Sequence, residues 1–326
     1  MHVAILGASG KIGRIVVQNL FASNAVPFDL TLLARRTERL EGLMMDVRPA
    51  AFWAAQEPAP VSVRLSADPS ALEGADLVLF LAGRFASPEE DAAFRAVDKT
   101  GRFVQSYLNH DLVVAMGQAL AAYAPRALVV MVSNQADMMA HLLRESFPPA
   151  SVLGFGGMLD RARFRQCAAD AGAPQEGAHM VGFHTNAMRP LRSTLTLAPD
   201  LCERVLQRTR AYGRSVFELQ KDASFPGLDT GPSILPGLAL ARIVRTFLGQ
   251  AEAFEASFNV SLGKAVAAHY GVSEGSALSV PVRVRKGGYD PLTDYAVSAE
   301  EKAYLKDAQA DMDDACRTMA ARFSGA

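Results

Sequence analysis

The chain has 326 residues, of which half are apolar and 21% charged, and its formal net charge is −1. This length exceeds the usual size of a single hydrophobic core, so we expect two globular domains. The 33 basic and 34 acidic side chains nearly cancel, which argues against a nucleic-acid-binding protein, because such proteins carry a marked excess of lysine and arginine.

The cysteines and the first residues indicate the compartment. Cys167, Cys202 and Cys316 are odd in number, widely spaced and without paired metal-ligand spacing, a pattern typical of a reducing cytoplasm. The chain begins directly with a strand-like run and carries no signal-peptide pattern. No apolar run reaches the length of a membrane span. We therefore expect a cytoplasmic protein without a metal site, a membrane partner or a nucleic-acid partner.

Short apolar runs alternate with helical patterns through the first half of the chain. Continuous apolar runs of this kind are typical of strands buried on both faces, and intervening helices join such strands into a parallel sheet. The predicted strands are 2–6, 28–34, 61–65, 76–82, 127–132 and 151–155. The predicted helices are 11–21, 39–45, 102–123 and 136–145. The pattern predicts an α/β fold with a parallel sheet in the N-terminal half.

The pattern changes after Phe147-Pro148-Pro149, which interrupts the last of these helices. We predict a domain boundary there, between 1–149 and 150–326. Residues 256–262 alternate strictly and are predicted as a half-buried strand. The other predicted elements beyond the boundary are helices at 160–171, 200–219, 236–248 and 299–323, and strands at 178–183, 193–197 and 277–285. This mixture predicts a C-terminal α+β domain with antiparallel strands.

A glycine-rich loop follows the first strand and opens the first helix. Its glycines allow a tight turn, bring backbone N–H groups to a pyrophosphate and let the helix pack closely on the strand. The first gap is one residue longer than in the usual G-x-G-x-x-G pattern, but the position directly after a strand favours a Rossmann dinucleotide-binding loop over a plain turn. The residues expected to hold the cofactor are Gly7, Ala8, Ser9, Gly10, Lys11, Ile12 and Gly13.

The end of the second strand favours NADP over NAD. NAD-binding chains place an acidic side chain there, which accepts the hydroxyl groups of the adenine ribose. This chain has Ala34 followed by Arg35 and Arg36, and no acid. Two guanidinium groups suit a 2′-phosphate, although solvated arginines at a helix start are the alternative. We expect NADP to be preferred, with NAD possible.

A third set of motifs runs through the rest of the chain. It consists of residues 41–46, Leu81-Ala82-Gly83-Arg84, Arg102 with Asn109, Val132-Ser133-Asn134, the run from Leu159 to Arg165 (LDRARFR), His184, and residues 278–281. With the glycine loop, their order and spacing resemble the lactate/malate dehydrogenase family over nearly the whole length. The resemblance implies hydride transfer between a nicotinamide cofactor and a 2-oxo/2-hydroxy acid, in a homodimer or homotetramer.

The resemblance implies three central roles. His184 would donate a proton to the substrate carbonyl oxygen during reduction and accept one during oxidation. Asp160 would orient His184 and stabilise its charged form. Arg163 would hold the substrate carboxylate with two hydrogen bonds, which lysine cannot reproduce.

The resemblance also implies supporting roles. Arg102 would close over the substrate and polarise its carbonyl group. Arg95 lies one residue out of register from the position where malate enzymes bind a second carboxylate, and Ser233 is expected at the far end of the pocket. Asn134 would contact both nicotinamide and substrate. Further cofactor contacts are expected from Ala34, Ala82, Gly83 and Asn109.

Some positions depart from the family pattern, and they leave three hypotheses open. Gln135 stands where the family has proline, Thr185-Asn186 follows His184, and the loop 84–101 is long and acidic. The leading hypothesis is an NADP-preferring malate-type dehydrogenase. The second is a dehydrogenase of lactate-like or bulkier 2-oxo acids, and the third is a dinucleotide-binding sensor without catalysis. The joint presence of Asp160, Arg163, His184 and Arg102 argues against the third.

Overall fold

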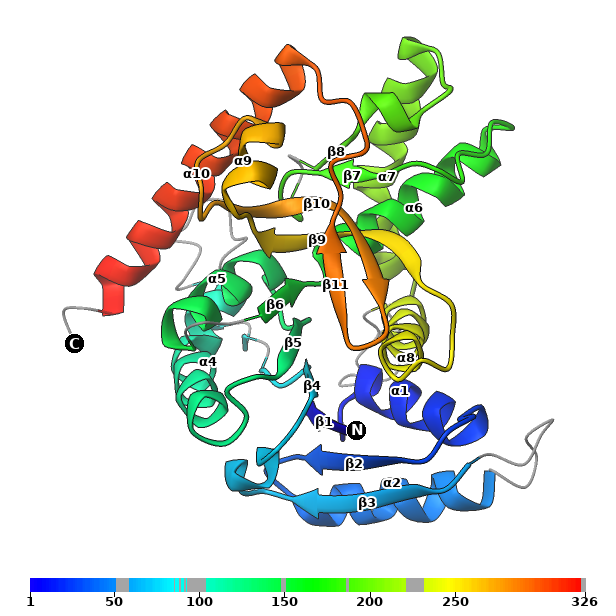
Figure 1. Cartoon of the computed structure of the whole chain (residues 1–326), viewed down its shortest axis with the longest axis vertical. Coiled ribbons are helices and arrows are strands. Elements are labelled where there is room, and N and C mark those ends of the chain that lie inside the picture. The colour runs from blue at the N-terminus through cyan, green and yellow to red at the C-terminus, as the bar shows by residue number, and fades with distance from the viewer. Residues whose placement is uncertain are drawn as a thin grey trace.

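The computed structural model describes residues 1–50, 59–84, 86–87, 89–90, 92, 104–147, 151–185, 188–220 and 232–323 (Figure 1). Arg95 and Arg102 lie outside the described residues. In the described part, no helix combines the length and the apolar character needed to cross a membrane. All three cysteines are free.

The predicted parallel sheet is confirmed. Its strands run in the order β6-β5-β4-β1-β2-β3, and every neighbouring pair among them is parallel. Every residue of β4 and β5 is buried, as continuous apolar strands require. The strands are β1 (His2–Leu6), β2 (Phe28–Leu33), β3 (Val61–Ser66), β4 (Leu77–Phe80), β5 (Leu128–Met131) and β6 (Ser151–Gly154).

The helices of this half cover both faces of the sheet. The chain moves outward from β1 in one direction through β2 and β3, and in the other through β4, β5 and β6. Right-handed crossovers, the rule for parallel strands, put the two sets of helices on opposite faces, and the strand order reverses between β1 and β4, the point at which such sheets bind ligands. The elements are α1 (Lys11–Ala22), α2 (Thr37–Ala50), η2 (Pro69–Leu72), α4 (Val104–Tyr123) and α5 (Ala136–Ser146).

The second half mixes longer helices with antiparallel strands. The helical elements are α6 (Gly156–Asp170), η3 (Arg192–Thr194), α7 (Pro199–Gln220), α8 (Ile234–Phe247), α9 (Lys264–Tyr270) and α10 (Ala299–Phe323). The strands are β7 (Met180–Val181), β8 (Arg189–Pro190), β9 (Phe254–Ser261), β10 (Ala277–Arg285) and β11 (Gly288–Pro291). A second small core, which includes Phe164 and Leu206, joins α6 to α7.

The antiparallel strands of this half continue the parallel sheet, because β9 pairs with β6 through Gly154 and Asn259, and among the described residues the combined sheet has nine strands. Two predicted elements of this half need correction. β9 is not half-buried, because its polar Ser257 and Asn259 are buried and hydrogen-bonded rather than solvated. The segment 193–197 is not a strand but begins in the short turn η3, and α9, β8 and β11 were not predicted.

Candidate active site

The glycine loop forms a cradle that larger residues would fill. Gly7 has a φ of 83°, and a Cβ atom there would lie 2.7 Å from the backbone nitrogen of Ala82, two residues after β4. A Cβ atom on Gly13 would lie 2.5 Å from the Ala8 carbonyl oxygen. The backbone N–H of Arg14 donates to the Gly10 carbonyl oxygen (2.9 Å), so the amides before it lie at the helix N-terminus, which favours an anion. The cradle therefore fits the pyrophosphate of a dinucleotide.

Two arginines lie where the second strand ends. Ala34 is partly buried directly after β2, and Arg35 and Arg36 are exposed beyond it. Within the part of the chain that the structure describes, neither guanidinium has an ion-pair partner. Both are therefore available to an anionic ligand at this edge of the sheet.

Asn109 on α4 fixes the loop that follows β4. Its side-chain oxygen accepts the backbone N–H of Arg84 (2.8 Å), and its amide nitrogen donates to the Arg84 carbonyl oxygen (3.0 Å). A Cβ atom on Gly83 would lie 3.2 Å from the same amide oxygen. Arg84 also forms a two-pronged ion pair with Glu90, with both distances 2.8 Å. Asn109 thus positions the loop, and Gly83 allows the close approach.

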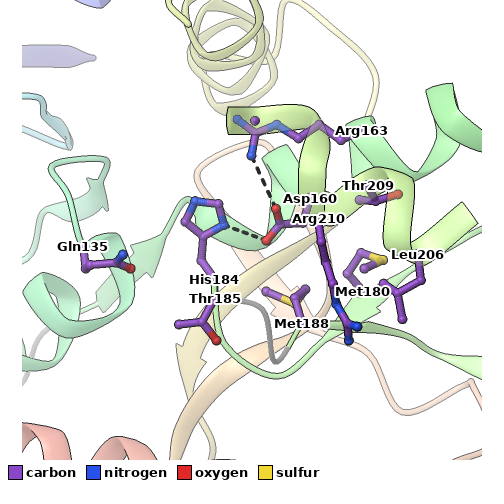
Figure 2. A pocket seen from close by; sticks show the side chains of 11 residues that line it. Gln135, Asp160, Arg163, Met180, His184, Thr185, Met188, Leu206, Thr209 and Arg210 are labelled. Atoms are coloured by element: carbon purple, nitrogen blue, oxygen red, sulfur yellow. Dashed lines mark hydrogen bonds and ion pairs between the residues drawn. The ribbon is translucent and has the colours of Figure 1, made fainter. Parts of the chain in front are cut away.

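His184, Asp160 and Arg163 form one cluster (Figure 2). The His184 Nδ1 atom lies 2.6 Å from one carboxylate oxygen of Asp160, and the other oxygen lies 3.5 Å from an Arg163 nitrogen. About a fifth of the His184 side chain is exposed, and 13% each of Asp160 and Arg163. One carboxylate therefore orients both the imidazole and the guanidinium.

Two glycines pack closely against this cluster. A Cβ atom on Gly156, at the start of α6, would overlap the Cβ atom of His184. A Cβ atom on Gly213, in α7, would lie 3.0 Å from a guanidinium nitrogen of Arg163. Closely packed interiors do not accommodate the overlap at Gly156, so the observed placement of His184 depends on glycine there. At position 213 a Cβ atom would instead require a small shift of the flexible Arg163 guanidinium.

The surroundings of His184 favour its charged form. Burial alone would lower the pKa of His184, but the charge and hydrogen bond of Asp160, with a smaller contribution from the charge of Asp137, raise it above its usual value. Arg163 opposes this effect. A histidine held in this way can carry a proton near neutral pH and release it.

The cluster lines a cavity of about 240 Å³. His184 and Thr185 follow β7 in the chain, whereas Leu206, Thr209 and Gly213 come from α7. Figure 2 shows Gln135 and Arg210 on opposite sides of His184. Among the described residues, the lining consists of Gln135, Asp160, Arg163, Met180, His184, Thr185, Met188, Leu206, Thr209, Arg210 and Gly213.

Among the described residues, Asn134 and Ser233 were also expected at the substrate site, and neither is in the cavity lining. Asn134 is exposed in the loop after β5, where its peptide bond to Gln135 is cis, and Gln135 rather than Asn134 lines the cavity. Ser233 is the N-cap of α8 and does not belong to the lining. Arg95 and Arg102 fall outside the described residues.

The sequence did not single out several residues of the site. Arg210 and Thr209 come from α7, which carries no motif, and only the packing of α7 on α6 reveals them. Asp137, at the start of α5, accepts a hydrogen bond from the backbone N–H of His184 (2.6 Å).

His179 lies beside Glu255 (3.6 Å) and is not among the residues that line the cavity, and burial lowers its pKa to about 4. Among the described residues, no group of three or more His, Cys, Asp or Glu side chains could hold a metal ion.

The chain is similar to known proteins over most of its length. A family model described as lactate/malate dehydrogenase, NAD binding domain, matches residues 1–154. Malate dehydrogenase 2 of Rhodopseudomonas palustris is 28% identical over 318 residues, which cover 91% of this chain and 90% of that protein. The malate dehydrogenase of a Nitratiruptor species is 26% identical over 317 residues, with 92% and 90% covered.

Solved structures share the fold. The malate dehydrogenase from Archaeoglobus fulgidus, in complex with NADH, superposes with a TM-score of 0.79 at 20% identity, covering 98% of this chain and 100% of that one. The lactate dehydrogenase from Cryptosporidium parvum, complexed with lactic acid and β-nicotinamide adenine dinucleotide, gives a TM-score of 0.76 at 19% identity, with 98% and 97% covered. The fold of this chain is therefore one that these dehydrogenases also adopt.

Proposed function

We propose that the chain is a member of the lactate/malate dehydrogenase family and that it interconverts a 2-oxo acid and the corresponding 2-hydroxy acid. The observation that carries this proposal is the cluster in which Asp160 contacts both His184 and Arg163 at the edge of one cavity. It supplies a proton carrier, its orienting carboxylate and a carboxylate-binding group, which is the set that this reaction needs. We propose that residues 1–149 bind the cofactor and 150–326 the substrate.

The protein's residues divide the work of this reaction. The glycine cradle, Ala82 and Gly83 would hold a nicotinamide dinucleotide, which when bound supplies the hydride for the substrate carbon. Arg163 would hold the substrate carboxylate and so orient the neighbouring carbonyl group. His184, with Nδ1–H donated to Asp160, would deliver a proton from Nε2 to the carbonyl oxygen. Arg102 would add a second positive charge beside that oxygen.

The two directions of the reaction should depend oppositely on pH. Reduction needs the protonated imidazole, so its rate should fall as the pH rises through the pKa of His184, whereas oxidation should rise over the same interval. Because Asp160 raises that pKa, Asp160→Asn should move both the fall in the reduction rate and the rise in the oxidation rate to lower pH. Initial rates in both directions across the pH range provide the measurement. Rates of reduction that do not depend on pH would contradict the role of His184.

We propose NADPH as the preferred cofactor, supported by the two exposed arginines and the lack of an acid at the end of β2. Reversing both charges, Arg35→Asp with Arg36→Asp, should remove the preference. Each charge-assisted contact to a 2′-phosphate contributes about 1.5–3 kcal/mol, or roughly ten- to a hundredfold in affinity. Fluorescence titration with NADPH and NADH measures both affinities.

The matched control for this test is Arg39→Asp with Arg48→Asp. Both residues are exposed on α2, and the control changes the net charge by the same amount. It should lower NADPH affinity much less than the variant at Arg35 and Arg36, since neither control residue directly follows β2 and exposed charges are screened by salt. Equal affinity of the unaltered protein for the two cofactors would overturn the preference and leave NAD as the cofactor.

For the substrate we propose oxaloacetate and malate, because the relatives cited above are malate dehydrogenases. The altered lining at Gln135 and Thr185 keeps lactate-like or bulkier 2-oxo acids as the second candidate. A panel of oxaloacetate, pyruvate and a branched 2-oxo acid, each tested with NADPH and NADH, separates the two. Turnover of none of them would favour the sensor hypothesis.

Assembly and compartment complete the proposal. We propose a homodimer or homotetramer, which sedimentation at several protein concentrations would test. The three widely spaced free cysteines support the cytoplasm as the compartment.

A further inference from the structure

A buried carboxylate, that of Asp137, contacts the backbone of His184. Asp137 is 3% exposed, and one of its oxygens accepts the backbone N–H of His184 at 2.6 Å. Its second oxygen has no hydrogen-bond partner among the described residues. His184 is therefore held by two carboxylates, with Asp160 at the ring and Asp137 at the backbone.

The packing around Asp137 leaves little freedom. A Cβ atom on Gly154, the last residue of β6, would lie 3.2 Å from the unpartnered Asp137 oxygen. Gly156, two residues further along, lets the His184 side chain pack closely on the start of α6. The loop carrying His184 is thereby fastened to α5, an element of the N-terminal half of the chain.

The charge of Asp137 is not neutralised by a direct ion pair within the described part of the chain. Arg144, also on α5, is partly buried and donates to the side chain and carbonyl oxygens of Asn259 and to the carbonyl oxygen of Val152, not to Asp137. The other charged or titratable groups that act on this region are His184, Asp160 and Arg163, with Tyr289 beside Arg144. Burial raises the pKa of Asp137 to about 6, so most of it is ionised at neutral pH.

We propose that Asp137 is a positioning residue for the dehydrogenase reaction, which anchors the His184 backbone and keeps a second negative charge near the imidazole. The inference rests on the proposed function of His184 as the proton donor. An anion near the imidazole favours the protonated form, which is the form that reduction consumes. A neutral hydrogen-bond acceptor would anchor the backbone equally well but would not supply this charge.

Asp137→Asn separates the two effects, because asparagine retains an acceptor oxygen for the His184 N–H and removes the charge. The pKa of the His184 imidazole can be measured by NMR titration of the full chain without substrate, and comparison with His184→Asn assigns its signals. We expect the pKa of His184 to fall in Asp137→Asn, and the upper pH limit of reduction to move down with it. NADPH affinity, measured by fluorescence, should not change.

Glu145→Gln is the matched control. Glu145 lies on the same helix and loses the same charge, but it is exposed and paired with His141. It should leave the pKa of His184 and the pH profile unchanged. If Asp137→Asn does not fold, as judged by circular dichroism, Asp137→Ser offers a smaller neutral acceptor for the same comparison.

Two results would overturn the proposal. One is an unchanged pKa of His184 in the folded variant, together with an unchanged pH profile. The other is a lower rate at every pH with an unchanged pKa, which would assign Asp137 a structural role alone. If the unaltered protein reduces no 2-oxo acid, the proposed function fails, whereas the NMR comparison still reports whether Asp137 acts on His184.

Discussion

Replacing His184 by asparagine is expected to slow 2-oxo acid reduction by roughly 10²–10⁴, the contribution of a positioned acid–base group. Asparagine cannot carry the proton, and it also leaves one oxygen of Asp160 without the imidazole that contacts it at 2.6 Å. The glycine cradle is remote from this change, so NADPH should bind with unaltered affinity. Stopped-flow rates and fluorescence titration measure the two quantities separately.

His141→Asn is the control for this variant. His141 lies on α5, is partly exposed and does not belong to the cavity lining, so its replacement should leave turnover unchanged. Unchanged turnover in His184→Asn would mean that the proton comes from another group. His179 is a poor substitute, because it lies outside the cavity and burial lowers its pKa to about 4.

The parallel sheet could be predicted because most of its strands are continuous apolar runs. Strand β1 has the predicted bounds, 2–6, and the glycine loop follows it directly. The local sequence was therefore sufficient to predict this strand and the loop after it. Strand β9 misled the prediction. Its alternating pattern indicates solvent on one face, but Asn259 accepts hydrogen bonds from the partly buried Arg144, and Ser257 accepts one from the backbone of Met180. Buried polar side chains that have hydrogen-bond partners give the same alternating sequence pattern as side chains exposed to solvent.

The three central site residues were predicted from motifs, whereas their supports were not. Asp137 looks in the sequence like an ordinary acid in the first turn of a helix, where acids are common. Its contact with His184 joins segments 47 residues apart, and no local pattern encodes this contact. Gly213 and Arg210 belong to the amphipathic helix α7. Which of its residues face Arg163 and the cavity is determined by tertiary packing rather than by a local motif.

Arg163→Lys is expected to lower kcat/KM for every 2-oxo acid by roughly 10²–10³. A guanidinium can give two parallel hydrogen bonds to a carboxylate, and an ammonium cannot reproduce that geometry. Each charge-assisted bond contributes about 1.5–3 kcal/mol, so the loss of one and the weakening of the other give this range. The effect should be similar for oxaloacetate and pyruvate, because both carry the carboxylate that Arg163 binds.

Arg165→Lys provides the matched control, since it makes the same substitution on the same helix. Arg165 lines a different cavity, together with Leu235 of α8 and Glu255 of β9, and its replacement should leave kcat/KM unchanged.

Gly213→Ala tests the position of the Arg163 guanidinium without changing Arg163 itself. Its Cβ atom would press on the guanidinium of Arg163 at 3.0 Å and should lower kcat/KM in the same direction without changing NADPH affinity. A loss confined to oxaloacetate in Arg163→Lys would mean that Arg163 binds the distal carboxylate, and the group that binds the shared carboxylate would then have to be sought elsewhere in the site.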